Sequence, residues 1–246
     1  MKGRKLNIKN LIILLCGLLA CIIFIYFIAT GISKEFTQSK EPKVINTPNI
    51  ESRTVVIDPG HGGYDDGAIA YNGYKESVIV LDIAKKVKAI LTYYNLNVVM
   101  SRESEEVTWS DDNVEDLRAR SDLANSSNAT LFVSIHCNSA EEIDEAKGSE
   151  IYVYFDQEES YRLANHINDE LKKITELENR EMKDANRFPL QLLIENQVPS
   201  CIVEMGFLTD YGDAEFMMSE EGQNKLANAI ATGILKDLNI EIKVNK

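Results

Sequence analysis

The chain has 246 residues, and 39 acidic against 26 basic side chains give it a net charge of −13 at pH 7. Hydrophobic residues make up 44% of the sequence, with 13 glycines and 5 prolines, which excludes a disordered or collagen-like chain. The acidic balance argues against nucleic-acid binding, because phosphate backbones would repel such a surface. A chain of this length can bury a core without disulfide bonds or structural metals, so we expect one domain of catalytic size.

The N-terminal residues have the pattern of a membrane anchor. Residues 11–29 (LIILLCGLLACIIFIYFIA) contain no charge and, as a helix, are long enough to cross about 30 Å of hydrocarbon. Residues 1–10 are basic, so the positive-inside rule predicts a cytoplasmic N-terminus and an extracytoplasmic body. A cleaved signal peptide or a lipoprotein signal at Cys21 are the alternatives, but the apolar run is long for a signal peptide and continues beyond Cys21. Residues 30–52 are polar, contain two prolines and are predicted to form a linker.

Apolar runs alternate with amphipathic segments throughout residues 53–246. Runs rich in β-branched residues predict strands over 54–57, 97–100, 130–135, 150–155 and 201–203. Apolar residues at helical spacing predict helices over 76–94, 113–126, 158–177 and 221–238. This alternation predicts a single α/β domain, with a twisted, mainly parallel sheet and helices on both faces.

Chemically active side chains follow several of these strands. Two of the three histidines, His61 and His136, come directly after predicted strands, and Glu204 follows another. Because ligands in open α/β sheets bind outside the carboxyl ends of the strands, these side chains should converge. Glu76, at the start of a predicted helix, can be folded back to the same place by a glycine-rich loop. Two imidazoles and one carboxylate are the ligand set of hydrolytic zinc sites, and the second carboxylate would act on the zinc-bound water. The spacing leaves open whether Glu76 or Glu204 binds the metal.

Further polar residues surround these four in the sequence. Asp58 is a candidate for accepting the second N–H of a histidine, and Asn138, two residues past His136, is a candidate for substrate contact. We interpret Arg102 and Arg120 as structural, in solvated or ion-paired positions.

Together these segments resemble the zinc-dependent N-acetylmuramoyl-L-alanine amidases of bacterial cell walls, the amidase-3 family. The resemblance extends over residues 54–238 and includes the segments VIDPGHGG (56–63), SIHCN (134–138), 148–152 and 199–208. It implies that His61, Glu76 and His136 bind Zn²⁺ and that Glu204 is the catalytic glutamate. The implied reaction is hydrolysis of the amide bond between N-acetylmuramic acid and L-alanine of the stem peptide. Zinc would polarise the amide carbonyl and activate water, while Glu204 passes the proton of that water to the leaving amine.

The sequence departs from the family pattern at two places, and it resembles one branch of the family in particular. Ser77 follows Glu76 where the family usually has lysine, and Ser101-Arg102 replaces the usual Thr-Arg. A membrane-anchored chain without a wall-binding domain resembles the spore-cortex and germination-specific branch, which forms muramic-δ-lactam together with a deacetylase; vegetative wall remodelling is the alternative. The expected partners are peptidoglycan glycan strands with their stem peptides, and the membrane through residues 11–29. The sequence does not indicate whether an activator protein is also a partner.

Two other functions compete with this expectation. A zinc peptidase or deacetylase would use the same metal chemistry on another cell-wall amide. A metal-free wall-binding module would keep the fold and lack the activity. The identity of the products separates the first from an amidase, and the zinc content separates the second.

Overall fold

The computed structural model describes residues 53–140 and 146–243. The expected basic segment, anchor and linker (residues 1–10, 11–29 and 30–52) lie outside the described residues. Within the described ranges, every helix is too short or too polar to cross a bilayer.

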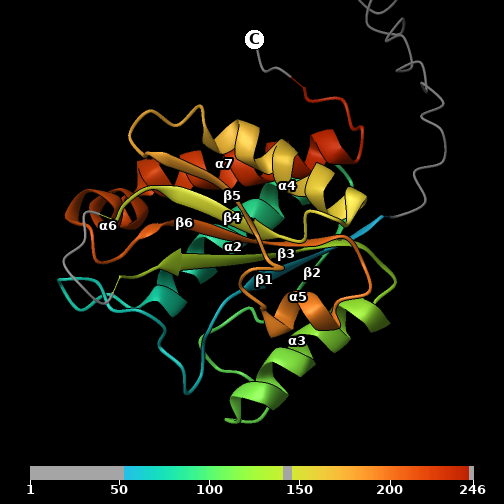
Figure 1. The fold of residues 1–246 in the computed structure, drawn as a ribbon, viewed down its shortest axis with the longest axis horizontal. Helices are drawn as coiled ribbons and strands as arrows, with labels where there is room; N and C mark the ends of the chain where they lie inside the picture. Colours follow the sequence, from blue (N-terminus) through green and yellow to red (C-terminus); the bar gives the residue numbers. More distant parts are fainter. Residues whose placement is uncertain (1–52, 141–145, 244–246) are drawn as a thin grey trace, which may run out of the picture. The chain divides into compact units, whose positions relative to one another are not determined.

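The centre of the fold is one six-stranded sheet with the order β2-β1-β3-β6-β4-β5 (Figure 1). Its strands are β1 (Thr54–Pro59), β2 (Asn97–Met100), β3 (Ala129–Asn138), β4 (Ser149–Val153), β5 (Asn179–Asp184) and β6 (Ser200–Phe207). Strands β2, β1, β3 and β6 are parallel to one another, whereas β4 is antiparallel to β6 and β5 is parallel to β4. The sheet is therefore mixed, and β4 and β5 begin at the edge where β3 and β6 end.

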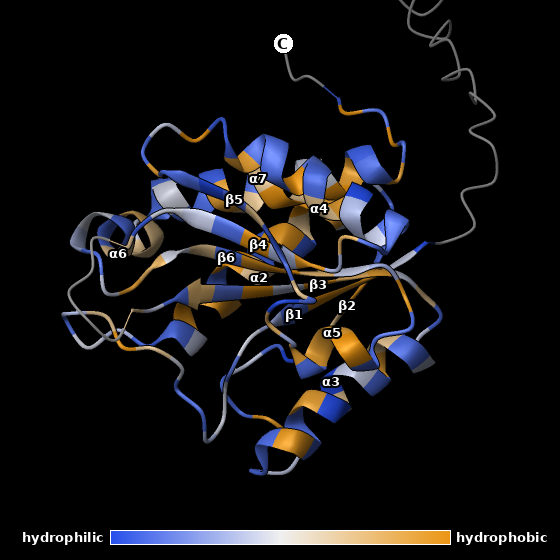
Figure 2. Ribbon diagram, viewed as in Figure 1, coloured by the Kyte–Doolittle hydropathy of each residue, from blue (hydrophilic) through white to orange (hydrophobic). Residues whose placement is uncertain are grey.

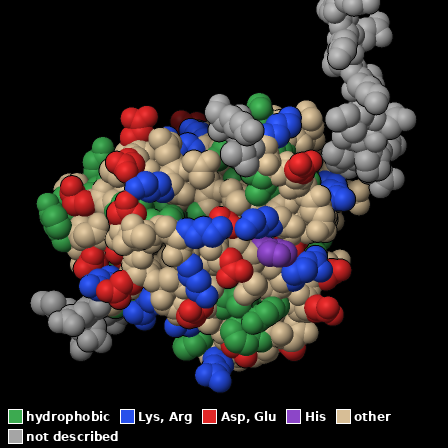
Figure 3. Space-filling view, turned by 90° about the horizontal axis from the view of Figure 1, so that it is seen from above, with side chains coloured by type: hydrophobic (Ala, Val, Ile, Leu, Met, Phe, Trp, Pro, Cys, Tyr) green, Lys and Arg blue, Asp and Glu red, His purple; other side chains and the backbone are tan. Residues whose placement is uncertain are grey.

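Helices cover both faces of the sheet, as expected. On one face lie α2 (Glu76–Tyr93), α4 (Glu158–Leu171) and α7 (Glu220–Asp237); on the other lie α3 (Asn113–Ser126) and the short α5 (Gln191–Glu195), while α6 (Tyr211–Met218) follows β6. Hydrophobic residues concentrate along the sheet and on the helix surfaces that meet it (Figure 2). Seen from the side of α4 and α7, the surface carries interspersed acidic and basic side chains (Figure 3).

The alternation of strand residues divides the apolar side chains between a larger and a smaller core. Val55, Ile57 and Val133 face the larger core under α2, α4 and α7, whereas Val56 and Phe132 face a smaller cluster with α3 and α5. The smaller cluster contains residues from the middle of the strands and leaves their carboxyl ends to polar side chains. This arrangement positions the site described below.

The expected elements need correction at four points. The helix expected over 158–177 ends at Leu171. The expectation was too long because Ile174 and Leu177, which lie beyond the helix and are also buried, continue the apolar spacing. Strand β5 (NREMKD) was not predicted, since its single apolar residue gives no strand pattern at the sheet edge. The short helices α5 and α6 were not predicted either, and β6 extends to Phe207, well past the expected end at residue 203.

Candidate active site

His61, Glu76 and His136 form a compact cluster at the carboxyl edge of the sheet. Glu76 Oε1 lies 3.1 Å from His61 Nε2 and 3.1 Å from His136 Nδ1, and these two nitrogens are 3.1 Å apart. His61 follows β1, His136 lies near the end of β3 and Glu76 begins α2. The convergence expected from the strand ends is therefore present in the structure.

The loop between β1 and α2 brings Glu76 to the histidines. The backbone N–H of Ala68 donates to Glu76 Oε2 (2.9 Å), and the backbone N–H of Cys137 donates to Glu76 Oε1 (2.8 Å). His61 has a left-handed backbone with φ of 58°, and its Nδ1 lies 2.7 Å from Asp65 Oδ2. Asp65 thus orients the imidazole ring so that Nε2 faces the cluster.

Two glycines make room for this packing. A β-carbon at Gly60 would lie 2.2–2.6 Å from atoms of the His136 ring. A β-carbon at Gly67 would lie 2.7–2.8 Å from atoms of Glu76 and 2.8 Å from the His61 ring, and Gly67 also has a φ of +69°. At both positions a side chain would displace a member of the cluster, and at Gly67 the positive φ also favours glycine.

The cluster is strongly coupled electrostatically. Burial alone raises the pKa of Glu76, but its hydrogen bonds to His136 and His61 outweigh burial and hold that pKa well below its usual range. Burial lowers the pKa of His61, but Glu76 and Asp65 outweigh it and raise the pKa to about 9. A negative carboxylate held between two imidazoles in this way favours a positive charge at the centre of the cluster.

The donor set fits a zinc ion. Ligand atoms at about 2.1 Å from a tetrahedral ion are about 3.4 Å apart, close to the 3.1 Å separations found here. Two imidazole nitrogens and one carboxylate oxygen leave one coordination position for water or substrate. Asp65 supplies the carboxylate that commonly orients a ligating histidine from behind.

Glu204 lies beside the cluster on the neighbouring strand. It is in register with His136, and its Oε2 atom is buried without a hydrogen-bond partner among the residues that the structure describes. Burial raises the pKa of Glu204 to about 7; His136 opposes this shift, while Glu76 and Glu150 add to it. Buried polar atoms without partners are rare in folded proteins, and this one is placed to exchange a proton with a ligand at the cluster.

Asp58 accepts no hydrogen bond from a histidine among the described residues, and that expectation is wrong. Its carboxylate accepts hydrogen bonds from Ser134 Oγ (2.7 Å), from Arg120 Nη1 (2.9 Å) and from Ser101 Oγ. Asp65, which belongs to the segments that resemble the family but was given no role from the sequence, orients His61 instead. The position of Asp65 four residues after His61, in a loop that doubles back, was the available signal.

Arg102 and Arg120 are structural and ion-paired, as expected, and both are buried. Arg120 donates to the carbonyl oxygens of Pro59 (3.0 Å) and His61 (2.7 Å). Arg102 donates to those of Pro59 (3.1 Å) and Gly60 (2.7 Å). The two guanidinium groups therefore fix the backbone that carries His61.

Asn138 lies on the same edge but is already engaged. Its Nδ2 donates to Glu150 Oε1 (2.8 Å), and Glu150 in turn accepts from Arg180 Nε (2.8 Å). Sequence reasoning missed Glu150, because the first residues of a strand parallel to β6 would lie at the opposite edge of the sheet. It missed Arg180 because the sequence of β5 has no strand pattern. A glutamate inside the otherwise apolar run EIYVYF was the signal that could have identified Glu150.

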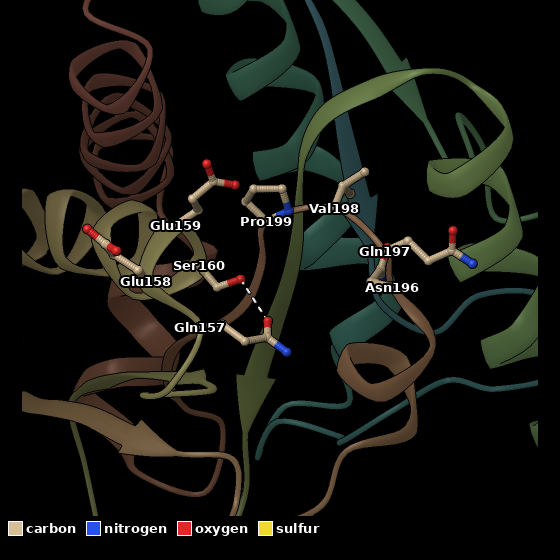
Figure 4. Close-up of a pocket in the computed structure, with 8 residues that line it drawn as sticks. All are labelled: Gln157, Glu158, Glu159, Ser160, Asn196, Gln197, Val198 and Pro199. Carbon is tan, nitrogen blue, oxygen red and sulfur yellow. Dashed lines mark hydrogen bonds between the residues drawn. The ribbon is translucent and has the colours of Figure 1, made fainter.

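A separate cavity lies at the opposite edge, before the start of β6 (Figure 4). Its lining is mainly polar and acidic, and Ser160 Oγ donates to Gln157 Oε1 within it (3.0 Å). The residues that line it are Gln157, Glu158, Glu159, Ser160, Asn196, Gln197, Val198 and Pro199. None of these belongs to the histidine cluster.

Comparison with known proteins adds independent evidence. The sequence profile of the N-acetylmuramoyl-L-alanine amidase family matches residues 55–236. The uncharacterised protein YqiI of Bacillus subtilis is 38% identical over 187 residues, which cover 75% of this chain and 84% of YqiI. The germination-specific N-acetylmuramoyl-L-alanine amidase of the same organism is 32% identical over 194 residues, which cover 76% of this chain and 80% of that protein.

Solved structures share the fold. The N-acetylmuramoyl-L-alanine amidase AmiC2 of Nostoc punctiforme matches with a TM-score of 0.68 and 36% identity, over 76% of this chain and 98% of that one. The CwlD amidase of Clostridioides difficile, solved in complex with the GerS lipoprotein, matches with a TM-score of 0.69 and 31% identity, over 77% and 100% of the two chains.

Proposed function

Because the chain belongs to the N-acetylmuramoyl-L-alanine amidase family, whose reaction is hydrolysis of the bond between N-acetylmuramic acid and L-alanine, we propose that it carries out this reaction on peptidoglycan with a zinc ion. One observation carries the zinc part of the proposal. It is the cluster of His61, Glu76 and His136, with the unpartnered carboxylate oxygen of Glu204 beside it.

Each residue has a defined task in this proposal. His61, Glu76 and His136 hold the ion, and zinc, when bound, supplies a Lewis acid for the amide carbonyl and lowers the pKa of water. Asp65 keeps the His61 ring in the ligating orientation. Glu204 accepts a proton from the attacking water at Oε2 and gives it to the amine nitrogen of the departing L-alanine.

The test combines a metal measurement with product identification. We expect the full chain, purified in detergent, to contain about one zinc per chain and to release peptides with free N-terminal L-alanine from peptidoglycan. A chelator should abolish the release, and added zinc should restore it. Elemental analysis and mass spectrometry of the products check both expectations.

Each contrary outcome points to a different function. Peptides with another N-terminus would indicate a peptidase, released acetate would indicate a deacetylase, and absence of zinc would favour a metal-free wall-binding module. Zinc without products would indicate that the chain requires a partner protein, a possibility that the CwlD–GerS complex illustrates for a relative.

We further propose that residues 11–29 anchor the chain, with residues 53–246 on the extracytoplasmic side, and that the enzyme acts in spore-cortex maturation. The uncharged run after a basic segment supports the anchor, and similarity to a germination-specific amidase supports the cortex role. Spores made without the chain should then lack muramic-δ-lactam, measured by chromatography of digested cortex. A chain without residues 1–29 should not restore the lactam. Normal lactam in the first strain would contradict the cortex role, and rescue by the shortened chain would contradict the anchor.

A further inference from the structure

Glu150 is a buried carboxylate that the proposed mechanism does not use. Its side chain is 4% exposed, and it is the register neighbour of Glu204 on the antiparallel strand β4. Its oxygens accept hydrogen bonds from Asn138 Nδ2 (2.8 Å), Tyr152 OH (3.0 Å) and Arg180 Nε (2.8 Å). Glu150 thus fixes three side chains from three strands around itself.

Arg180 is held in one orientation, with most of its donors left available. Its Nε bonds to Glu150, and its guanidinium carbon lies 5.1 Å from the centre of the Phe207 ring. An arginine has five N–H donors, so four remain on Nη1 and Nη2. Within residues 53–140 and 146–243, none of these four has an acceptor, and the side chain is 38% exposed.

The reversed direction of β4 and β5 brings Arg180 to the catalytic edge. His136, Glu204 and Glu150 occupy matching positions on three adjacent strands, and the Glu150–Arg180 ion pair continues this row to β5. Neighbouring strands are about 4.8 Å apart, so Arg180 lies roughly 10 Å from Glu204. That distance corresponds to about three residues of extended peptide.

The charge of the surroundings indicates what the free donors would bind. The chain has a net charge of −13, and carboxyl groups of Glu76, Glu150 and Glu204 lie at this edge. An anionic substrate therefore requires a fixed cation where it docks. The stem peptide of peptidoglycan carries carboxylates, and the two Nη groups of a guanidinium match a carboxylate with two parallel hydrogen bonds.

We propose that Arg180 binds a stem-peptide carboxylate and that Glu150 is the positioning residue that aims it. This inference rests on the proposed amidase function. Arg180 then selects substrates by charge, at a distance from the metal ligands. A purely structural role, in which Arg180 only neutralises Glu150, gives no such selection.

The test compares two forms of one polymer. Peptidoglycan with free stem-peptide carboxylates is assayed beside the same material amidated with carbodiimide and ammonia. We expect wild-type kcat/KM to be on the order of 10- to 100-fold higher on the free form, as for hydrogen bonds between charged groups. Arg180→Gln should remove this preference mainly by lowering the rate on the free form, and Arg180→Lys should keep part of it. The ratio of the two rates within one variant does not depend on the folded fraction.

Matched variants separate selection of the substrate carboxylate from a simple ion pair with a buried carboxylate. Arg162 also bonds through Nε to a buried carboxylate, Asp237 (2.8 Å), but it belongs to α4 on the other face of the sheet. Arg162→Gln should leave the preference unchanged. Glu150→Gln, which keeps an acceptor for Arg180 Nε, should retain more of the preference than Glu150→Ala.

Two results would overturn the inference while leaving the amidase function intact. One is equal wild-type rates on the two polymers, and the other is an unchanged preference in Arg180→Gln. Failure of the wild type to release L-alanine-terminated peptides from either polymer would instead contradict the proposed function, and this inference with it.

Discussion

Glu204→Gln is expected to lower kcat by about 10²- to 10⁴-fold while the zinc content stays at about one ion per chain. Glutamine has nearly the same shape but cannot accept the proton of the attacking water. The zinc content should survive, because the cluster itself consists of His61, Glu76 and His136. Turnover on peptidoglycan and elemental analysis of the same preparation measure the two quantities.

Stability provides a control for this variant. The pKa of Glu204 rises from 4.5 to about 7 on folding, so the folded state binds more protons than the unfolded state between these values. The metal-free wild type therefore loses stability from this group as the pH rises from about 4.5 to 7. Glu204→Gln removes that loss, and the variant should be at least as stable as the wild type at pH 7.

His136→Ala is the contrasting variant, since it removes a ligand and should abolish both zinc binding and turnover. Wild-type kcat in Glu204→Gln would show that another group takes the proton. Loss of zinc in Glu204→Gln would show that Glu204 belongs to the ligand set.

Arg120→Met is expected to lower the free energy of unfolding by about 3–5 kcal/mol, the usual cost of removing one partner from a buried ion pair. Arg120 lies between the buried carboxylates of Asp58 (2.9 Å) and Asp116 (2.6 Å). It also carries hydrogen bonds to the backbone at His61, so zinc affinity should fall with stability. Urea unfolding and zinc titration measure the two effects.

Arg118→Met is the matched control, because Arg118 is exposed on the same helix and its replacement should change stability by no more than about 0.5 kcal/mol.

The loss of stability caused by Arg120→Met should also depend on pH. Burial raises the pKa of Asp58, but Arg120, Ser101 and Ser134 outweigh it and lower that pKa below 3.8. The stabilisation from this carboxylate is thus complete above pH 3.8 and is lost as the pH falls through the folded pKa. A cost that is unchanged at pH 2 would contradict the ion-pair explanation.

The position of the site could be predicted from sequence, because its key residues follow apolar runs. His61, His136 and Glu204 each come after a run that forms a strand, and parallel strands bring their ends together. Glu76 was predictable only in part: its helix start was visible, but the hydrogen bonds from Ala68 and Cys137 that fix its carboxylate depend on the folded loop.

What could not be predicted depends on strand direction and on long-range contacts. The run at 150–155 has the same apolar pattern whether its strand is parallel or antiparallel, so the placement of Glu150 beside Glu204 was not accessible. The edge strand β5 has too little apolar character to be recognised, and Arg180 was missed with it. Asp58 was wrongly assigned because proximity in sequence to His61 does not determine which way a buried side chain points.

Because β4 and β5 run in the opposite direction to the other strands, separate stretches of the chain supply two groups of residues at this edge of the sheet. The proposed metal ligands and proton acceptor come from the ends of parallel strands and from the start of α2, whereas Arg180, the proposed carboxylate contact, and Glu150, which positions it, come from the beginnings of two strands that run the other way. If Arg180 binds a stem-peptide carboxylate, mutations at the start of β4 or β5 change which wall polymers are accepted without altering a proposed metal ligand. A lineage could in this way adapt to a differently modified peptidoglycan while its chemistry is conserved.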